Sequence, residues 1–246
     1  MADGAPPASG GVVVGGASGI GAAVVERYRD AGRPVVVWDV HESADIRCDL
    51  TDEQQIDAAL AATLDRVDEL PTEITVTAGV GHSGLLNDIT RAEWDRVLAV
   101  NVTGPWLVMR AWARQFVAHD ANASIVATSS VSARLVDRSM GAYCTSKAAL
   151  SMTVRVAAAE WAPTIRVNAV APGVTATPML GGAPVDSGWL RDVAHRTALG
   201  RLGSADDIAD AVLALHALPW VTGQVLEVDG GLAMWSPINA WDATHP

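Results

Sequence analysis

Short hydrophobic runs alternate along the chain with longer segments whose apolar residues recur about every 3.6 residues, the period of a helix. The short runs are rich in Val and Ile, which favour strands. We expect strands at Gly11–Gly15, Pro34–Val40, Ile74–Ala78, Ser124–Ser129, Ile165–Ala171 and Val225–Val228. We expect helices at Ile20–Ala31, Asp52–Leu70, Arg91–His119 (interrupted near Gly104-Pro105), Tyr143–Trp161 and Ala205–Leu218. Continuous apolar strands that alternate with helices predict a parallel sheet covered on both faces, a doubly wound α/β fold.

Capping residues support several of these boundaries. Thr51, followed three residues later by Gln54, is the expected N-cap of the second helix, and Thr90 and Ser204 are expected to cap two later helices. Gly32 is expected to end the first helix, because glycine adopts the left-handed backbone of a C-terminal cap.

The 246 residues are half hydrophobic and 18% charged, which is enough apolar surface for one packed core. Neither a repeat nor a linker divides the chain, so we expect one domain over residues 1–246. Its expected parts include a flexible lead-in at 1–9, a substrate lid at 179–202 and a tail at 232–246. The first residues lack the features of a signal peptide, and no apolar run approaches the roughly 20 residues of a membrane span.

The net charge of −11 disfavours a nucleic-acid partner, because an acidic surface repels phosphates. Cys48 and Cys144 are too few for a disulfide framework or a metal cluster. We therefore expect reduced thiols, a cytoplasmic location and no metal site.

A glycine-rich turn, Gly15-Gly16-Ala17-Ser18-Gly19-Ile20-Gly21, directly follows the first expected strand. Glycines at this place let backbone N–H groups approach a pyrophosphate, and the helix N-terminus adds partial positive charge. A glycine cluster alone is equally compatible with a tight turn, but its position between a strand and a helix favours a dinucleotide site. The candidate contacts are Gly15, Ser18, Gly19, Ile20 and Gly21.

Asp39 ends the second expected strand, where a carboxylate can accept hydrogen bonds from the adenosine ribose hydroxyls. The same charge would repel a 2′-phosphate, and neither the glycine turn nor the two positions after Asp39 offer Arg or Lys in compensation. The pattern predicts NAD in preference to NADP. The alternative is an exposed carboxylate with no ligand.

Tyr143 and Lys147 lie four residues apart and therefore share one face of a helix. A tyrosine with a pKa of about 10 exchanges protons poorly near neutrality, and a nearby ammonium lowers that pKa. A Tyr-x-x-x-Lys pair is common on surface helices, so the pair needs support. Ser130 supplies a hydroxyl after the preceding strand, and Asn101 is an amide among apolar residues that must find partners. The loop Val170–Pro178 then leaves a strand at the edge where open α/β sheets bind ligands.

With these motifs the sequence resembles the single-domain branch of the short-chain dehydrogenase/reductase family, from Gly11 to Gly231. Further matches are Cys48-Asp49-Leu50, Arg166–Gly173 and Val228-Asp229-Gly230-Gly231. The resemblance implies a doubly wound Rossmann fold, a nicotinamide cofactor and a homotetramer.

The resemblance also implies roles for single residues. Tyr143 would be the general acid/base and Ser130 would hold the substrate oxygen. Lys147 would bind the nicotinamide ribose and lower the tyrosine pKa, and Asn101 would anchor a water in a proton relay. The implied adenine contacts are Asp49 and Leu50, and the implied carboxamide contacts are Thr175 and Thr177. The remaining implied cofactor contacts are Ala78, Gly79, Pro172 and Gly173. The chain departs from the family's usual Asn-Asn-Ala-Gly stretch with Val76-Thr77-Ala78-Gly79, which puts the local hydrogen bonding in question.

These features predict hydride transfer between NAD and a secondary alcohol or ketone. Apolar residues of the lid and of the loop before Tyr143 predict a hydrophobic aryl or cyclic substrate, unless they only pack the lid. The candidate substrate contacts are Ser130, Leu135, Met140, Met179 and Trp189, with Val136, Leu180, Val185 and Leu190 as further pocket residues. Arg134, Arg138 and Arg191 are too scattered to form a phosphate site.

Two other functions compete with this one. A non-catalytic NAD-binding regulator would not need all four of Asn101, Ser130, Tyr143 and Lys147, and a sugar-nucleotide epimerase would need a larger C-terminal domain. His82 either contacts substrate or is a solvated loop residue. We expect Trp235 and Trp241 in the tail either to dock on a neighbouring subunit or to pack on their own subunit.

Overall fold

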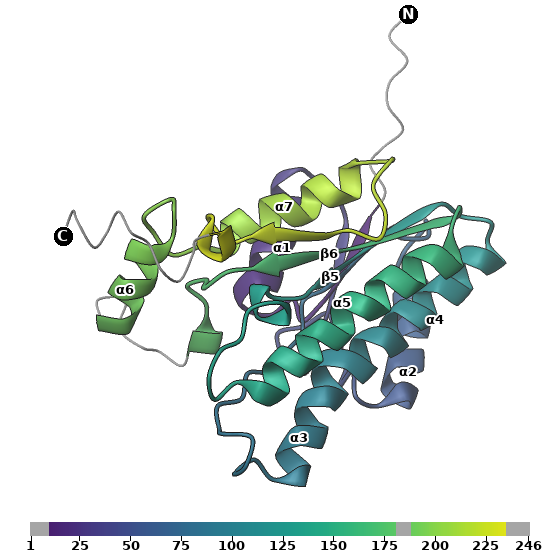
Figure 1. The fold of residues 1–246 in the computed structure, drawn as a ribbon. Helices are drawn as coiled ribbons and strands as arrows, with labels where there is room; N and C mark the ends of the chain where they lie inside the picture. Colours follow the sequence, from purple (N-terminus) through teal and green to yellow (C-terminus); the bar gives the residue numbers. More distant parts are fainter. Residues whose placement is uncertain (1–9, 181–187, 235–246) are drawn as a thin grey trace, which may run out of the picture.

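The structure, a computed structural model, describes residues 10–180 and 188–234 of the chain. Its centre is a seven-stranded parallel sheet in the order β3-β2-β1-β4-β5-β6-β7 (Figure 1). The strands are β1 (Gly11–Val14), β2 (Val35–Asp39), β3 (Ile46–Arg47), β4 (Glu73–Val76), β5 (Ala123–Thr128), β6 (Ile165–Pro172) and β7 (Val225–Val228). The chain order reverses between β1 and β4, and the carboxyl ends of strands beside such a switch point are where α/β sheets bind ligands.

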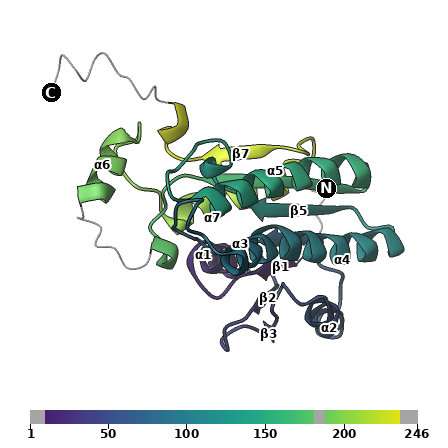
Figure 2. The same cartoon turned by 60° about the horizontal axis from the view of Figure 1, so that its bottom comes forward.

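Helices cover both faces of the sheet (Figures 1 and 2). They are α1 (Gly19–Asp30), α2 (Glu53–Leu64), α3 (Arg91–Leu98), α4 (Gly104–Ala118), α5 (Gly141–Trp161), α6 (Gly188–Arg196) and α7 (Ala205–Ala217). Helices α1 and α7 lie together on one face, and α2, α4 and α5 lie on the other. The doubly wound fold predicted from the hydrophobic pattern is confirmed.

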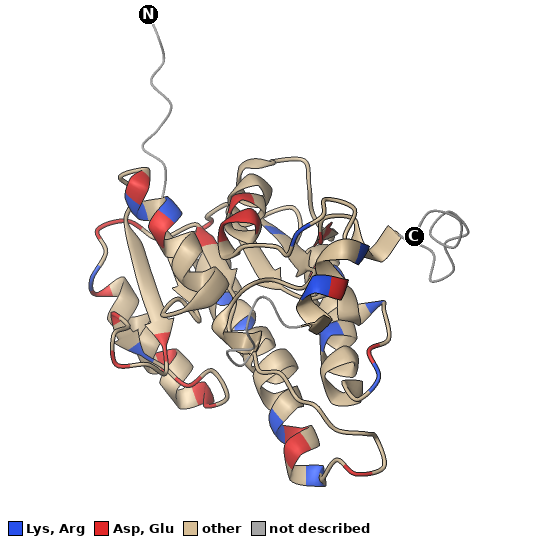
Figure 3. Ribbon diagram, turned by 90° about the vertical axis from the view of Figure 1, so that its left-hand side faces the viewer, with Lys and Arg blue, Asp and Glu red and all other residues tan. Residues whose placement is uncertain are grey.

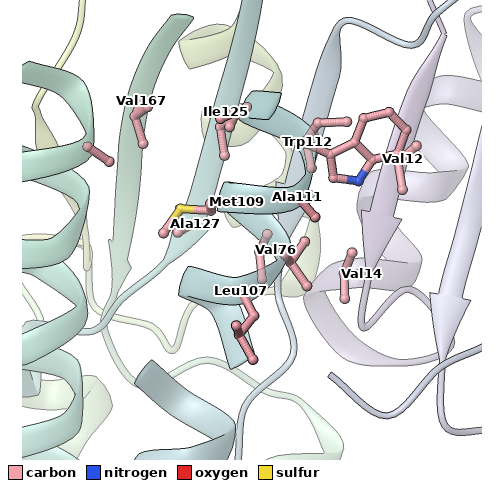
Figure 4. Close-up of a cluster of buried hydrophobic side chains, with 14 of the residues drawn as sticks. Val12, Val14, Val76, Leu107, Met109, Ala111, Trp112, Ile125, Ala127 and Val167 are labelled. Atoms are coloured by element: carbon pink, nitrogen blue, oxygen red, sulfur yellow. The ribbon is translucent and has the colours of Figure 1, made fainter. Parts of the chain in front are cut away.

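The two faces are separated by the alternation of side chains along each strand. In β1, Val12 and Val14 pack against the face of α2, α4 and α5, whereas Val13 packs against α1 and α7. Figure 4 shows Val12 and Val14 beside Trp112 of α4 in the first of these cores. The strands can be continuously apolar because both faces are buried.

Charged residues lie mainly on helices and loops (Figure 3). Within the described ranges, no helix has the length and apolar character needed to cross a membrane.

The expected elements are found, with ends that differ by up to two residues for most of them and with larger differences at a few places. The two-residue strand β3 was not predicted, and the second helix ends at Leu64 instead of Leu70. Its N-cap is Asp52, whose carboxylate accepts from the N–H groups of Gln54 and Gln55, so the expectation of Thr51 was wrong. The Thr51 hydroxyl donates to Asp49 instead, at 2.7 Å.

The long helical segment after residue 91 is interrupted directly before Gly104-Pro105, as expected. It divides into α3, a π-helical turn η1 (Ala99–Thr103) and α4. Short helical turns also follow β5 and β6, at η2 (Val131–Ala133) and η3 (Pro178–Leu180). The expected lid at 179–202 contains α6, and residues 181–187 within it lie outside the described residues. The same holds for the expected lead-in at 1–9 and for most of the tail.

Candidate active site

The glycine turn joins β1 to α1 with little space between neighbouring backbones. Gly15 and Gly19 have φ values of +84° and +53°, a region that favours glycine. A Cβ on Gly15 would lie 2.5 Å from the Ala78 nitrogen, and one on Gly21 would lie 2.1 Å from the Gly15 oxygen. The turn therefore requires glycine at these positions.

The first turn of α1 is open to an anion. Ser18 stands at its N-cap without a side-chain capping bond, and no acidic residue lies in the first turn. By contrast, Asp52, Thr90 and Ser204 cap α2, α3 and α7 with their side chains. Uncapped N–H groups at a helix N-terminus suit a phosphate, so this end of α1 fits the pyrophosphate of a dinucleotide.

Asp39 lies beside this turn, as its position in the sequence predicts. One carboxylate oxygen accepts from the Ala17 N–H and the other from the His41 N–H, both at 3.0 Å. These bonds hold a negative charge next to the glycine turn. The neighbouring strand β3, which the sequence did not reveal, brings Arg47 into register with Asp39.

Thr77 stands in the stretch where the family usually has Asn-Asn-Ala-Gly. Its hydroxyl donates to the carbonyl oxygens of Val14 and Gly15, both at 3.0 Å, so it ties the end of β4 to the end of β1.

Asp49 and Leu50, the implied adenine contacts, follow β3. The Asp49 carboxylate accepts from the backbone and hydroxyl of Thr51, at 2.9 and 2.7 Å. The Leu50 side chain is buried against Gly104, where an added Cβ would overlap it. Leu50 therefore contributes to the core through its side chain, and only its backbone is available to a ligand at this edge.

Tyr143 and Lys147 are both buried on α5, one helical turn apart. The Lys147 Nζ lies 5.7 Å from the centre of the Tyr143 ring and donates to the Thr128 carbonyl at 2.8 Å. Burial lowers the pKa of Lys147 to about 8. Ser129 and Ser151 donate to the Lys147 carbonyl at 3.1 and 2.9 Å, which fixes this turn of α5 against β5.

Ser130 lies directly after β5, and its hydroxyl is hydrogen-bonded to the Tyr143 phenol. Burial raises the pKa of Tyr143, and the bond from Ser130 offsets part of that rise. Desolvation of the phenolate is the largest effect on this pKa, and the Lys147 ammonium faces the Thr128 carbonyl. The lowering of the tyrosine pKa implied for Lys147 stays a prediction.

Asn101 occupies the π-helical turn η1 and is fully buried. Its Oδ1 accepts from the Val80 N–H at 2.8 Å, and its Nδ2 donates to the Val80 carbonyl at 2.9 Å and to the Ser146 hydroxyl at 3.0 Å. The buried amide thus finds the partners that its apolar surroundings demand. The water relay implied for Asn101 stays a prediction.

Gly79 lies at the centre of this group. A Cβ at this position would be 3.3 Å from the Asn101 Oδ1, 3.4 Å from the Lys147 Nζ and 4.0 Å from the Met179 Cε. The implied cofactor residues Ala78 and Gly79 therefore lie between the glycine turn and Lys147, and the Met179 side chain lies close to the same place.

The loop after β6 returns to the glycine turn. The Gly173 N–H donates to Val228 at 3.1 Å, and the Thr175 hydroxyl donates to the Gly173 carbonyl at 3.1 Å. The Thr177 Cβ lies 3.5 Å from where a Cβ on Gly19 would stand. Thr177 thus lies beside the glycine turn, whereas Thr175 is buried and its hydroxyl bonds within its own loop. Pro172 ends β6 itself.

The structure brings some of the expected substrate residues close together and leaves others apart. Met140 and Leu135 are half-buried in the loop between Ser130 and Tyr143, and Met179 is half-exposed above Gly79. Trp189 is exposed on α6. Of the further pocket residues, Leu190 is buried, Leu180 is half-buried and Val136 is almost fully exposed. Val185, Trp235 and Trp241 lie outside the described residues.

His82 is not a solvated residue. Its side chain is 10% exposed, and its Nε2 lies 3.6 Å from the Glu93 Oε1. Thr77, the Thr128 carbonyl and the serines around Lys147 are further site residues that sequence reasoning missed. A hydroxyl in place of the family's asparagine was a usable signal for Thr77, but no sequence pattern points to a backbone carbonyl.

Comparison with known proteins agrees with this geometry. A protein-family model described as Enoyl-(Acyl carrier protein) reductase matches residues 15–233. Cis-4-hydroxycyclohexanecarboxylate dehydrogenase of Sinomonas cyclohexanicum is 34% identical over 242 residues, covering 89% of this chain and 94% of that protein. Galactitol 2-dehydrogenase (L-tagatose-forming) of Cereibacter sphaeroides is 36% identical over 245 residues, covering 91% and 94%.

Among solved structures, ligand-free aldohexose dehydrogenase of Thermoplasma acidophilum superposes with a TM-score of 0.87 at 29% identity, covering 94% of this chain and 96% of that one. These matches extend over nearly the whole sequence and include the strands and helices that assemble the site. The chain belongs to the short-chain dehydrogenase/reductase family.

Proposed function

We propose that this protein transfers hydride reversibly between NAD and a secondary alcohol or ketone, with a hydrophobic cyclic or aryl compound as substrate. The observation that carries the proposal is the buried group of Ser130, Tyr143, Lys147 and Asn101 at the switch-point edge of the sheet, next to the uncapped N-terminus of α1. Acid/base groups of this kind have no use in a protein that only binds a dinucleotide.

In the proposed reaction, a bound nicotinamide supplies the hydride acceptor or donor. The Tyr143 phenol holds its proton at neutral pH, because burial raises its pKa, and it gives that proton to the ketone oxygen during reduction. The Ser130 hydroxyl donates a hydrogen bond to the same oxygen as negative charge develops there. During alcohol oxidation Tyr143 takes the proton as phenolate, and the Lys147 ammonium stabilises that anion.

The cofactor preference rests on Asp39. Its carboxylate is fixed beside the glycine turn by two backbone N–H groups, where it suits ribose hydroxyls and repels a 2′-phosphate. The residues proposed to hold the cofactor are Gly15, Ser18, Gly19, Ile20, Gly21, Asp39, Asp49, Leu50, Ala78, Gly79, Pro172, Gly173, Thr175 and Thr177, together with Tyr143 and Lys147.

The substrate class rests on the side chains above the catalytic pair. Met179 and the half-buried Leu135 and Met140 offer apolar contacts. Two relatives are named for cyclic alcohols, a hydroxycyclohexanecarboxylate and a dichlorocyclohexadiene-diol, and others for the acyclic polyol galactitol. The apolar contacts favour the cyclic compounds.

We further propose that the protein is a homotetramer of the cytoplasm. A groove of about 410 Å³ runs between α4 and α5, and exposed Trp106 and Val156 line it. Packing of α4 and α5 of one subunit against the same two helices of another subunit would cover the exposed Trp106 and Val156. The two free cysteines fit a reducing compartment. Light scattering of Val156→Glu against the unmodified chain tests the assembly, which should dissociate in the variant.

The experiment that tests the activity measures nicotinamide reduction, by its ultraviolet absorbance, with NAD or NADP and a panel of cyclic, aryl and polyol alcohols. Tyr143→Phe should lose about 10²- to 10⁴-fold in kcat while its NAD affinity, measured by calorimetry, stays close to that of the unmodified protein. NAD binding with no turnover of any alcohol would favour the non-catalytic regulator. Activity retained in Tyr143→Phe would exclude Tyr143 as the acid/base.

A further inference from the structure

The loop of residues 80–86 connects β4 to α3 and passes over the catalytic pair. It begins at Val80, whose two backbone groups are held by the Asn101 amide. One residue later, a Cβ on Gly81 would lie 4.0 Å from the Met179 Cγ. The first part of the loop is therefore fixed beside the Lys147 side chain and under the lid.

The second part of the loop packs on the segment that leads into the catalytic helix α5. The Gly84 N–H donates to the Ser139 carbonyl at 2.7 Å, and Gly84 forms an isolated bridge with Met140. Leu86 packs on Gly141, where an added Cβ would lie 2.5 Å from its Cδ2. The loop consequently spans from the Lys147 side of the site to the first turn of α5, just before Tyr143.

Ser139, the partner of Gly84, has a φ of +71°, which is strained for a residue other than glycine. A strained residue stays in this conformation only where its neighbours hold it there. The contact with the loop is one such restraint, so the position of the loop and the position of Met140 depend on each other.

His82 is the side chain that anchors the middle of this loop. Its imidazole packs on Gly84, where an added Cβ would lie 3.0 Å from the ring Cε1, and its Nε2 faces the Glu93 Oε1 at 3.6 Å. The Nδ1 is buried and has no hydrogen-bond partner among the described residues. Nε2 is therefore the ring nitrogen through which this loop contacts α3.

Glu93 is itself held by hydrogen bonds at the start of α3. Its Oε2 accepts from the Thr90 N–H and hydroxyl at 2.8 and 2.7 Å, and it forms the capping box of α3. The hydrogen bond from the Thr90 hydroxyl is the main cause that lowers the pKa of Glu93, so the group is a carboxylate at neutral pH.

We infer that His82 is a positioning residue: its contact with Glu93 fixes the loop of residues 80–86 between α3 and α5, as one wall of the substrate site above Tyr143 and Lys147. The expected effect on the alcohol KM rests on the proposed function, whereas the expected effect on the loop itself does not. Removal of the contact should loosen the alcohol site and leave the cofactor site intact, because Gly79 and Val80 keep their own anchor at Asn101.

Three variants of the full chain separate the contact from simple packing. His82→Leu fills the space without a donor, whereas His82→Gln places an amide nitrogen close to the position of Nε2. Glu93→Gln retains an oxygen for the capping box of α3 but removes the negative charge. It serves as a second probe should His82→Leu fold poorly, a point checked by thermal unfolding.

The first measurement is hydrogen exchange by mass spectrometry, which needs no turnover. His82→Leu should speed exchange in peptides covering residues 80–90 and leave α5 and the sheet unchanged, and His82→Gln should resemble the unmodified chain. Unchanged exchange in His82→Leu, or equal acceleration in His82→Gln, would overturn the inference. This result stands even if no alcohol is turned over and the proposed function fails.

The second measurement is steady-state kinetics with the best alcohol of the panel. His82→Leu should raise the alcohol KM about fivefold, with kcat and the NAD KM within about twofold of the unmodified values, and His82→Gln should restore the alcohol KM. A parallel rise in the NAD KM, or an alcohol KM that does not change, would contradict the positioning role. In a double-mutant cycle, His82→Leu and Glu93→Gln should be less than additive.

Discussion

The Asn101 side chain holds both backbone groups of Val80, accepting from its N–H at 2.8 Å and donating to its carbonyl at 2.9 Å. Asn101 reaches Val80 from a π-helical turn, a distortion that often marks functional sites because it redirects side chains and frees backbone groups. The contact keeps Gly79 close to the Lys147 ammonium. The position of Gly79 and Val80 thus depends on one buried amide.

Asn101→Ala should lower both activity and stability. The free energy of unfolding should fall by about 2 kcal/mol, because the Val80 groups lose their buried partners. The kcat/KM should fall at least about tenfold as the loop moves away from Lys147. Chemical denaturation and steady-state kinetics measure the two effects, with Gln54→Ala, a change at an exposed amide on α2, as control. Full activity in Asn101→Ala would show that the loop holds its position without the amide.

The features of this site that lie within one short segment could be predicted from the sequence, because the spacing of their residues sets their geometry. A four-residue separation puts Tyr143 and Lys147 on one helix face, and a glycine-rich turn between a strand and a helix sets its own conformation. The sheet followed from the apolar runs, because strands buried on both faces carry a strong hydrophobic signal.

The remaining parts depend on contacts between distant segments. No local pattern shows that Lys147 donates to the Thr128 carbonyl or that Asn101 reaches Val80. The strand β3 has two residues, too few for a periodic signal, so the position of Arg47 opposite Asp39 was also hidden. The burial that raises the pKa of Tyr143 likewise depends on packing between distant segments and has no local sequence pattern.

Asp39→Asn should shift the cofactor preference toward NADP. The variant removes the negative charge that repels a 2′-phosphate and leaves Arg47, in register on β3, as a candidate cation. The ratio of kcat/KM for NADP to that for NAD should rise about tenfold, equivalent to about 1.4 kcal/mol. The double variant Asp39→Asn with Arg47→Ala should lose most of this gain. An unchanged ratio in Asp39→Asn would mean that other residues set the preference.

The rate of alcohol oxidation should rise with pH through neutrality. Burial raises the pKa of Tyr143, so the reactive phenolate is scarce at pH 7 and increases about tenfold per pH unit. The rise should flatten above the pKa of Lys147, about 8, where the ammonium that stabilises the phenolate loses its charge. Ketone reduction, which uses the protonated phenol, should not show this rise.

Ser130→Ala provides the matched variant for the pH profile. The hydrogen bond from Ser130 lowers the pKa of Tyr143, so its removal should move the rising limb of oxidation to higher pH. The variant should also lose about 10²-fold in kcat, because one donor to the developing oxyanion is gone. A kcat loss with an unmoved profile would show that Ser130 acts on the substrate alone.

The stability of the protein should fall on acidification because of His216, which lies far from the catalytic edge of the sheet. Its ring nitrogens lie 3.0 Å from the hydroxyls of Thr75 and Ser124, and burial lowers its pKa to about 3 from an ordinary 6.5. Between these values the unfolded chain binds a proton that the folded chain does not, so the free energy of unfolding should fall by about 1.4 kcal/mol per pH unit as the pH drops below 6.5. Urea unfolding at several pH values measures this slope. His216→Gln, which cannot be protonated, should be less stable at pH 7 but should show a shallower decline, and an equal decline in both chains would assign acid sensitivity to other groups.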